Sequence, residues 1–578
     1  MKYFLQNWKP EYDGILYFFH RVQEMLFHYS DDIVRAPIHN TKTLINEYLE
    51  NEAEMQKNNV PAYQIEQILS ELCYSLQHDR ILAQNLGEDF IQTINEKIKN
   101  DTKDIINYLN SKFPHQTYYK WCINYLREHI LQHKHKKEIE FATRVWIVEV
   151  VSNGYSPEYI YTYLSNKMSK PIAEPEKFFN EFIDNFSFNY HLFRVYFQFS
   201  PQILECKELF KTRIGVEFND DGNFNLLKKR KNDFIGYVEV KALDRYNASF
   251  SAYNKVSIFV KYYKTLTNRI DELIRPHSFV KDVNTLELNI VPVKPKGYRS
   301  YKPEPTTEFK DSVDTIILSC QNKKNARKSI NKMITLHNVA IQQDDLNDGF
   351  LNFWSILEII SSDICCKAKI EKVIKAVVPT LEKDYFTSVL SNIEDDLKHN
   401  LNKSDYTALI DLTQTDDSLE LNYICRFIFL PEFEELRDSY FEKLENFPVI
   451  RTKIYNLWEL RNSKQDLMKL SKKYAQRVTW HIYRLYRTRN SIVHSGETHP
   501  RIQALGEHLH IYVDQIMMEI IVKLLEEQTL HTISDVLTDT SLFMLKKEKH
   551  FNIPSSINED DLILLCNSYF YESNNTDL

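Results

Sequence analysis

Apolar residues recur at helical spacing through roughly the first third of the chain. Over residues 137–151 they follow a repeat of three to four positions that ends at Asn153-Gly154, where a glycine can cap a helix. Ser156-Pro157 then supplies an N-cap residue followed by proline at the first helical position. The stretch Ile91–Leu109 has the same spacing. We therefore expect a helical N-terminal domain over residues 1–175.

Short runs of β-branched and aromatic residues replace this pattern between residues 176 and 292. Four runs are predicted as strands: Val195–Phe199, Ile214–Phe218, Tyr237–Val240 and Val256–Val260. The turn sequence Asn219–Gly222 separates the second run from the third. We expect a mixed α+β domain here, with a sensor or regulatory role.

Residues 293–307 are rich in proline and poor in apolar residues, which predicts a linker. A helical pattern resumes over residues 308–530, where we expect a helical domain with an insertion at about 365–470. Residues 531–578 are predicted to form a tail with one short helix, Glu559–Phe570. The predicted fold class is mainly α with a central α+β domain and a C-terminal helical bundle.

Two helices of the 308–530 region carry the chemistry of interest. The first, Leu346–Ser362, has an apolar stripe, and Glu358 follows Trp354 by one turn. The stripe consists of Phe350, Leu351, Trp354, Leu357 and Ile360. The second helix, Lys472–Val493, has a predicted core face made of Val478, Ile482, Leu485 and Ile492.

The second helix is unusually basic for a chain whose formal net charge is -8. Between Lys472 and His494 there is no acidic residue and there are six cations, Lys472, Lys473, Arg477, Arg484, Arg487 and Arg489. Aromatic residues lie among them, and such interleaving suits phosphate contacts combined with stacking on single-stranded bases. The alternative is a solvated helix that pairs with acidic neighbours such as residues 432–442, and the charge pattern alone favours this alternative.

The end of this helix carries an arginine and a histidine five residues apart. Arg489 and His494 should point about 140° apart on a regular helix, whereas Asn490 and His494 differ by only about 40°. Arg489 and His494 can meet at one phosphate if the helix tightens or bends there, for which Gly496 offers freedom, or across a two-fold interface. In the structural alternative, His494 only caps carbonyl groups at the helix end.

Arg489-Asn490-x-x-x-His494, at the end of a basic helix, resembles the R-x(4–6)-H signature of HEPN domains, in which the second position is commonly Asn, His or Asp. The segment Phe353–Glu358 is similar to the first core helix of the ApeA-like HEPN branch, which is often found in bacterial antiphage proteins. The resemblance covers about residues 310–530, and the long spacer from Cys365 to about Leu470 departs from the family pattern.

The resemblance implies a metal-independent endoribonuclease that acts on RNA, with tRNA as one candidate, in abortive-infection defence. The 2′-OH of RNA attacks the adjacent phosphate, an imidazole transfers protons, and a guanidinium holds the phosphate oxygens. His494 and Arg489 take these roles, Asn490 orients the imidazole or bonds a phosphate oxygen, and Glu358 positions Arg489 or His494. The expected RNA-binding residues are Lys472, Lys473, Arg477, Arg484 and Arg487. HEPN ribonucleases generally act as homodimers, and a catalytically silent HEPN scaffold is the open alternative.

A rival hypothesis comes from the predicted strands. Glu239-Val240-Lys241 follows Asp221 by 18 residues, which resembles the metal-dependent PD-(D/E)xK nuclease motif. Alternation along a strand also exposes Glu and Lys on one face without any such function, and no Pro-Asp precedes. We favour the strand interpretation.

Further features limit the partners and cofactors that we expect. No glycine-rich phosphate loop is present, and the eight cysteines form no CxxC pair. The cluster of His129, His133 and His135 lacks a cysteine frame, so we interpret it as a solvated helix end. No apolar stretch reaches the length of a membrane span or a signal peptide. We expect a cytoplasmic protein without metal or cofactor, whose first 300 or so residues sense a trigger such as a phage component.

Overall fold

Helices account for most of the chain, and one antiparallel sheet lies in the middle of the sequence, as predicted. The computed structural model describes residues 1–26, 39–58, 62–132, 135–202, 207–218, 233–267, 273–293, 298, 324–343, 345–413, 423–496, 499, 501–527 and 529–566. Contacts divide the chain into a helical unit, Met1–Val145 with Gly297–Leu578, and a sheet unit, Trp146–Lys296. The sheet unit begins inside a helix, α9 (Lys136–Ser152), rather than near residue 175.

The helical unit begins with a series of short and medium helices. They are α1 (Asp13–Leu26), α3 (Thr41–Asn58), α4 (Ala62–His78), α5 (Arg80–Leu86), α6 (Glu88–Lys97), α7 (Thr102–Lys112) and α8 (His115–His129). The predicted helix over Ile91–Leu109 is in fact α6 and α7, separated by a turn before Thr102. Side-chain capping helps to fix where one of these helices begins. Asp79 accepts a hydrogen bond from the backbone N–H of Leu82 at the start of α5.

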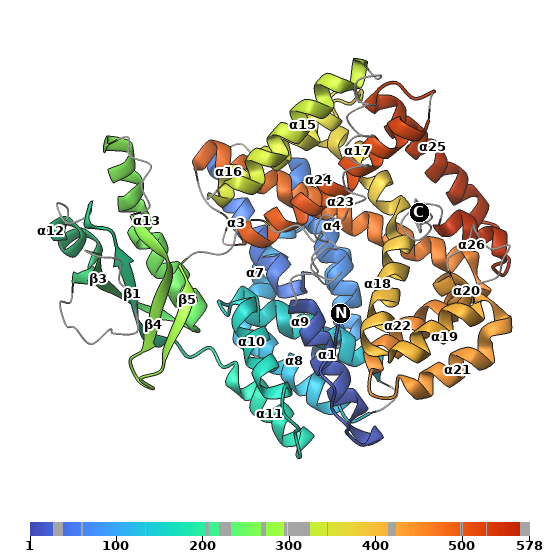
Figure 1. The fold of residues 1–578 in the computed structure, drawn as a ribbon, viewed down its shortest axis with the longest axis horizontal. Coiled ribbons are helices and arrows are strands. Elements are labelled where there is room, and N and C mark those ends of the chain that lie inside the picture. Colours follow the sequence, from blue (N-terminus) through green and yellow to red (C-terminus); the bar gives the residue numbers. More distant parts are fainter. Residues whose placement is uncertain are drawn as a thin grey trace. The chain divides into compact units, whose positions relative to one another are not determined.

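The second part of the helical unit contains the longest helices of the chain. They are α15 (Lys324–Gln342), α16 (Leu346–Ile360), α17 (Lys369–Lys383), α18 (Tyr385–Asn400), α19 (Lys403–Thr413), α20 (Tyr423–Phe429), α21 (Glu434–Lys443), α22 (Pro448–Glu459), α23 (Lys464–Ser495), α24 (Ile502–Glu526), α25 (Ile533–Phe551) and α26 (Glu559–Cys566). α16 packs against α15, α24 and α23, and α17 packs against α23, α24 and α25 (Figure 1). A single apolar core lies between these helices, so they form one bundle, which we call the motif bundle.

The two helices singled out in the sequence supply much of this core. Phe350, Trp354, Leu357 and Ile360 of α16 are buried, and Leu351 packs at the edge. All four residues of the predicted core face of α23 are buried as well. The helical periodicity therefore identified the buried faces of both helices, because a stripe of that width can leave water only by packing on neighbours.

The motif bundle includes segments that the sequence analysis assigned elsewhere. α17 lies within the predicted insertion, yet Ile370, Val373 and Val377 belong to the bundle core. α25 lies within the predicted tail, yet Ile533 and Val536 belong to the same core. The chain between the core helices α17 and α23 is therefore residues 384–463, shorter than predicted. An amphipathic stripe shows that a helix is partly buried but not against which partner it packs.

Tyr298 is one of two residues of the predicted linker that the structure describes, and it is buried in the motif bundle. Its hydroxyl donates a hydrogen bond to the carbonyl oxygen of Leu346. Gly349 and Gly506 leave room for its ring, since a Cβ atom at Gly506 would lie only 2.0 Å from it. The other described linker residue, Val293, is buried in the core of the sheet unit.

The sheet unit holds five antiparallel strands in the order β2-β3-β1-β4-β5. Their bounds are β1 (His191–Phe199), β2 (Glu217–Phe218), β3 (Phe234–Ala242), β4 (Ile274–Asp282) and β5 (Leu288–Pro292). The unit also contains α10 (Pro157–Met168), α11 (Pro175–Asn185), α12 (Lys207–Leu209) and α13 (Arg245–Thr267). Alternate residues of the central strand β1 pack with α13 in one apolar core.

Two of the four strand predictions are confirmed, at Val195–Phe199 and Tyr237–Val240. Of Ile214–Phe218, only Glu217-Phe218 is a strand. The prediction for Val256–Val260 is wrong, because these residues lie in α13. Its buried residues Ala248, Ala252 and Val256 recur every fourth position, and this longer helical pattern overrides the β propensity of a short run. The predicted turn Asn219–Gly222 lies outside the described residues.

Among the described residues, no helix combines the length and the apolar character that crossing a membrane would require.

Candidate functional site

α23 is an unbroken helix from Lys464 to Ser495, and the motif residues lie in its last two turns. The Ser463 side chain caps its start by accepting from the backbone N–H of Asp466. Gly496 ends it in the left-handed region, with a φ of 68°. The α-helix is uninterrupted through Arg489 and His494, so on regular helical geometry these side chains leave it about 140° apart. Gly496 adopts its left-handed conformation only after the motif, so it does not alter the helix between Arg489 and His494.

Arg489 is held by a chain of polar contacts that begins in the bundle core. The indole N–H of buried Trp354 donates to Oε1 of Glu358 at 3.0 Å. The same oxygen lies 3.7 Å from a terminal nitrogen of Arg489. Another terminal nitrogen of Arg489 donates to Oδ1 of Asn490 at 3.3 Å. The structure thus brings three of the four predicted site residues together, with Glu358 beside Arg489.

These groups remain partly open to solvent, because the side chain of Arg489 is 26% exposed and that of Glu358 is 37% exposed. A guanidinium at this depth can exchange its carboxylate partner for a phosphate group, since both are anionic acceptors whose two oxygens an arginine can bind bidentately. Glu358 therefore orients Arg489 and also competes with any anion that approaches it.

His494 lies one turn after Asn490 on an exposed surface, next to the exposed Val493. Within the part of the chain that the structure describes, its imidazole makes no hydrogen bond or ion pair. An accessible imidazole can exchange protons with a bound substrate. Its position on the helix is about 140° from that of Arg489.

The middle of α23 differs from the predicted basic surface. Arg484 and Arg487 were expected to bind RNA, but both are buried. The guanidinium of Arg484 donates to both carboxylate oxygens of Glu47 on α3, at 2.8 to 3.0 Å, and to Glu71 on α4 at 2.6 Å. Arg487 also pairs with Glu47. The expectation for these two residues is corrected, because their donors already face buried carboxylates.

The charges of this buried cluster depend on one another. Burial alone would raise the pKa of Glu47, but the guanidinium groups of Arg484 and Arg487 hold it well below its usual value. The pKa of Glu71 is raised, because burial outweighs the attraction of Arg484 there. The arginines therefore favour the charged form of Glu47 more strongly than that of Glu71.

The other three predicted RNA-binding residues lie near the start of α23. Lys472, Lys473 and Arg477 are exposed. The ammonium group of Lys472 lies 3.3 Å from Glu382 of α17 and 3.1 Å from Glu548 of α25. It therefore joins three helices of the motif bundle, which matches the alternative in which a basic helix pairs with acidic neighbours.

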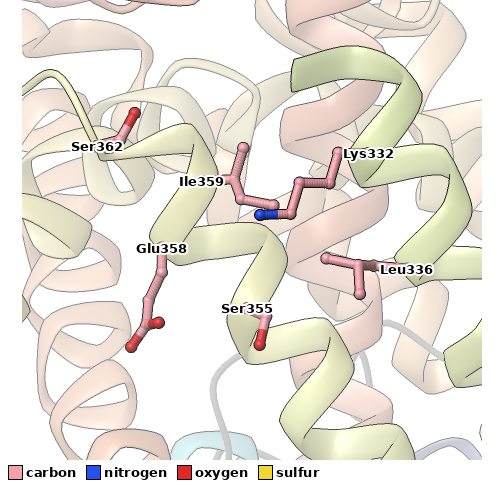
Figure 2. A pocket seen from close by; sticks show the side chains of 6 residues that line it. All are labelled: Lys332, Leu336, Ser355, Glu358, Ile359 and Ser362. Carbon is pink, nitrogen blue, oxygen red and sulfur yellow. The ribbon is translucent and has the colours of Figure 1, made fainter. Parts of the chain in front are cut away.

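A shallow groove of about 390 Å³ lies between α15 and α16, with Glu358 in its wall. Figure 2 shows Lys332 extending from α15 toward α16, where Ser355, Glu358 and Ser362 lie. Lys332 belongs to an exposed set on α15 that also includes Arg327 and Lys328. The sequence analysis missed this set, although residues 323–342 contain several cations and no acidic residue.

The residues of the rival nuclease motif lie on β3 in the sheet unit. Glu239 pairs across the sheet with Arg194 of β1, at 2.8 Å. Lys241 is exposed on the same face as Glu239. Asp221 lies outside the described residues. The Glu239–Arg194 contact is an ordinary cross-strand charge pair, which supports the strand interpretation.

Comparisons with known proteins give no information on the function of the chain. No protein-family model matches the chain, and neither the curated proteins nor the solved structures contain a match.

Proposed function

We propose that this chain is a metal-independent endoribonuclease that cleaves RNA by attack of the 2′-OH on the adjacent phosphate. The observation that carries the proposal is the exposed end of α23, where Trp354 and Glu358 hold Arg489 beside Asn490 and His494 lies one turn further. A cation fixed by a buried support and an accessible imidazole are the two groups that this reaction needs. The resemblance of Arg489-Asn490-x-x-x-His494 to HEPN ribonucleases supports the same reaction.

In the proposed step, an imidazole accepts the proton of the 2′-OH as its oxygen forms a bond to phosphorus. The bond from phosphorus to the 5′ oxygen breaks, and that oxygen takes up the proton that the imidazole accepted. The guanidinium of Arg489 leaves Glu358 and binds the non-bridging phosphate oxygens. It stabilises the charge that develops on them. The products are a 2′,3′-cyclic phosphate end and a 5′-OH end, so neither water nor a metal ion takes part.

The unbroken helix favours a site built from two copies of the chain. Because Arg489 and His494 diverge by about 140°, apposition of two α23 ends about a two-fold axis would bring the arginine of one copy to the histidine of the other. The exposed Val493 beside His494 provides an apolar contact for such a pairing.

The N-terminal helices are the proposed control element. α3 and α4 bind α23 through Glu47 and Glu71, so a trigger that moves these helices also moves the helix that carries the motif. In antiviral defence the trigger would be a phage component and the substrate a cellular RNA such as tRNA. We place the activity in the cytoplasm, where both occur.

The function is tested with full-length protein, purified RNA and excess EDTA, while circular dichroism verifies that the chelated protein stays folded. We expect cleavage to persist in EDTA and to leave 5′-OH ends. The substitution His494→Ala should lower the rate by about 100- to 10,000-fold. The control His399→Ala removes an exposed histidine of α18 and should leave the rate unchanged.

Two outcomes would contradict the proposal. Cleavage that is lost in EDTA although the protein stays folded, and that depends on Glu239, would favour the metal-dependent nuclease. A wild type without activity would favour a silent interaction module, and an activity that His494→Ala leaves intact would not arise from the proposed site.

The two-copy site is tested by mixing inactive Arg489→Ala and His494→Ala proteins under conditions that exchange subunits. A mixed dimer keeps one arginine and one histidine at one of its two composite sites, so we expect recovery of up to about a quarter of the wild-type rate. A site contained within one chain would show no recovery.

A further inference from the structure

Two histidines and an aspartate meet between α15 and α24, outside the contacts of Arg489. The Nε2 atom of His337 on α15 lies 3.0 Å from Nε2 of His510 and 2.7 Å from Oδ1 of Asp514, both on α24. Nε2 of His510 lies 3.5 Å from Oδ2 of Asp514. Because His510 and Asp514 are four residues apart, the helix places them on one face. Among the described residues, His337, His510 and Asp514 are the histidine, cysteine or acidic side chains whose ligand atoms lie close enough together to hold a metal ion.

Hydrogen bonds account for only some of the contacts among these three side chains. A neutral imidazole carries one N–H, so Nε2 of His337 cannot donate a full hydrogen bond to Asp514 and to His510 at the same time. A divalent cation, in contrast, accepts a lone pair from each imidazole nitrogen and from the carboxylate. The three atoms that crowd together here are of the types that ligate zinc.

The spacing of the donor atoms also fits a zinc ion. Bonds of about 2.0 to 2.1 Å in a tetrahedral site place neighbouring donor atoms about 3.3 Å apart. Nε2 of His337 lies 3.0 Å from Nε2 of His510 and 2.7 Å from Oδ1 of Asp514, and one ligand atom from each of the three residues lies within 4.8 Å of the others. The His337–Asp514 contact would have to open by about half an ångström to admit the ion.

The surroundings hold the imidazole rings and leave one side accessible. The ring of Phe353 on α16 stacks on His510 with centroids 4.4 Å apart and meets His337 edge-on at 5.6 Å. The side chain of His510 is 1% exposed, whereas those of His337 and Asp514 are 19% and 13% exposed. Solvent can thus reach the His337 side, where a water molecule would complete four-coordination.

We propose that His337, His510 and Asp514 bind one divalent transition-metal ion, with zinc the best match. Imidazole donors exclude magnesium and calcium, which prefer sets of oxygen ligands. The ion joins α15 to α24, and α15 carries Lys332 five residues before His337. Metal binding therefore holds in place the helix that lines the groove beside Glu358. The proposed cleavage step uses none of these ligands, so the two proposals stand independently.

Metal content tests the site in full-length protein that is stripped with chelator and then equilibrated with zinc by dialysis. We expect about one tightly held zinc ion per chain, and a higher thermal unfolding midpoint with zinc than without it. Cobalt(II) should replace zinc and give the intense visible absorption of a tetrahedral site.

The variants His337→Gln and Asp514→Asn should lose the tight zinc ion, the cobalt absorption and the thermal shift. His337 and Asp514 are chosen because they are partly exposed, whereas replacing the buried His510 would disturb the core. The matched control His399→Gln, an exposed histidine on α18, should behave as wild type. This control separates the proposed site from nonspecific zinc binding by other histidines, of which the chain has 19 in total.

Two results would overturn the site: a wild-type protein that retains no zinc after dialysis, or His337→Gln and Asp514→Asn proteins that retain as much zinc as the control. Neither readout depends on RNA cleavage, so a failed ribonuclease test leaves the outcome for the metal unchanged.

Discussion

The middle and the end of α23 contain the same kinds of residue in opposite surroundings. Arg484 and Arg487 are buried against Glu47 and Glu71, whereas Arg489 is partly exposed and His494 is fully at the surface. The middle of this continuous helix therefore packs against the N-terminal helices α3 and α4, whereas its end is open to solvent. A basic stretch in a sequence need not be one surface, because residues two positions apart, such as Arg487 and Arg489, point to nearly opposite sides of a helix.

The difference lies in where the compensating carboxylates come from. Glu47 and Glu71 precede Arg484 by more than 400 residues, and the tertiary fold brings them to Arg484 and Arg487. Glu358 comes from the adjacent helix α16 and meets Arg489 near the surface, at a longer distance. Buried charges need complete partners, while a charge near water can exchange its partner for a ligand.

The largest expected effect is on stability, from Glu47→Gln. Arg484 and Arg487 would remain buried with their main counter-ion removed, which should lower the free energy of unfolding by about 3 to 5 kcal/mol. Urea unfolding measures this loss. Glu432→Gln, at an exposed carboxylate, serves as the control and should stay within about 0.5 kcal/mol of wild type. A loss below 1 kcal/mol for Glu47→Gln would mean that the two halves of α23 do not differ as described.

A smaller effect should appear in the pH dependence of the same pair of proteins. The folded-state pKa of Glu47 lies below its usual value of 4.5, so its stabilising charge is fully present above that pH. The contribution is lost as the pH falls through the folded-state pKa. The stability gap between wild type and Glu47→Gln should therefore narrow below pH 4.5, by up to about 1.4 kcal/mol per pH unit. Urea midpoints between neutral and acidic pH measure the gap, and a constant or widening gap would contradict the depressed pKa.

The smallest effect concerns RNA affinity at the exposed groove. Lys332→Ala, in a His494→Ala background that prevents cleavage, should weaken RNA binding and reduce the slope of log affinity against log salt by about 0.7, the value for one contact with single-stranded nucleic acid. Lys469→Ala removes an equally exposed lysine near the start of α23 and should change neither quantity. Fluorescence anisotropy with labelled RNA at several salt concentrations measures both variants, and equal slopes would remove Lys332 from the proposed RNA path.

Local pattern was enough to predict the faces of individual helices. The buried stripe of α16, the core face of α23 and the end of α9 near Gly154 all follow from apolar spacing and caps within a few residues. Partners were not predictable in this way. α17 and α25 show ordinary amphipathic patterns, and nothing in them identifies the bundle that they join. The Val256–Val260 error has the same origin, since the sheet decided which of two competing periodicities was used.

The sequence by itself determined that the chain is mostly helical, that α16 and α23 bury particular stripes, and that Arg489, Asn490 and His494 follow one another at a helix end. Only the tertiary structure decided which cations are buried, that Glu358 meets Arg489, and that His337 joins His510 and Asp514. His129, His133 and His135 are closer in sequence, but a metal-like cluster arises from helices 170 residues apart. The physical reason is that periodicity depends on neighbours along the chain, whereas the pairing of charges and ligand atoms depends on which helices the folded core brings into contact.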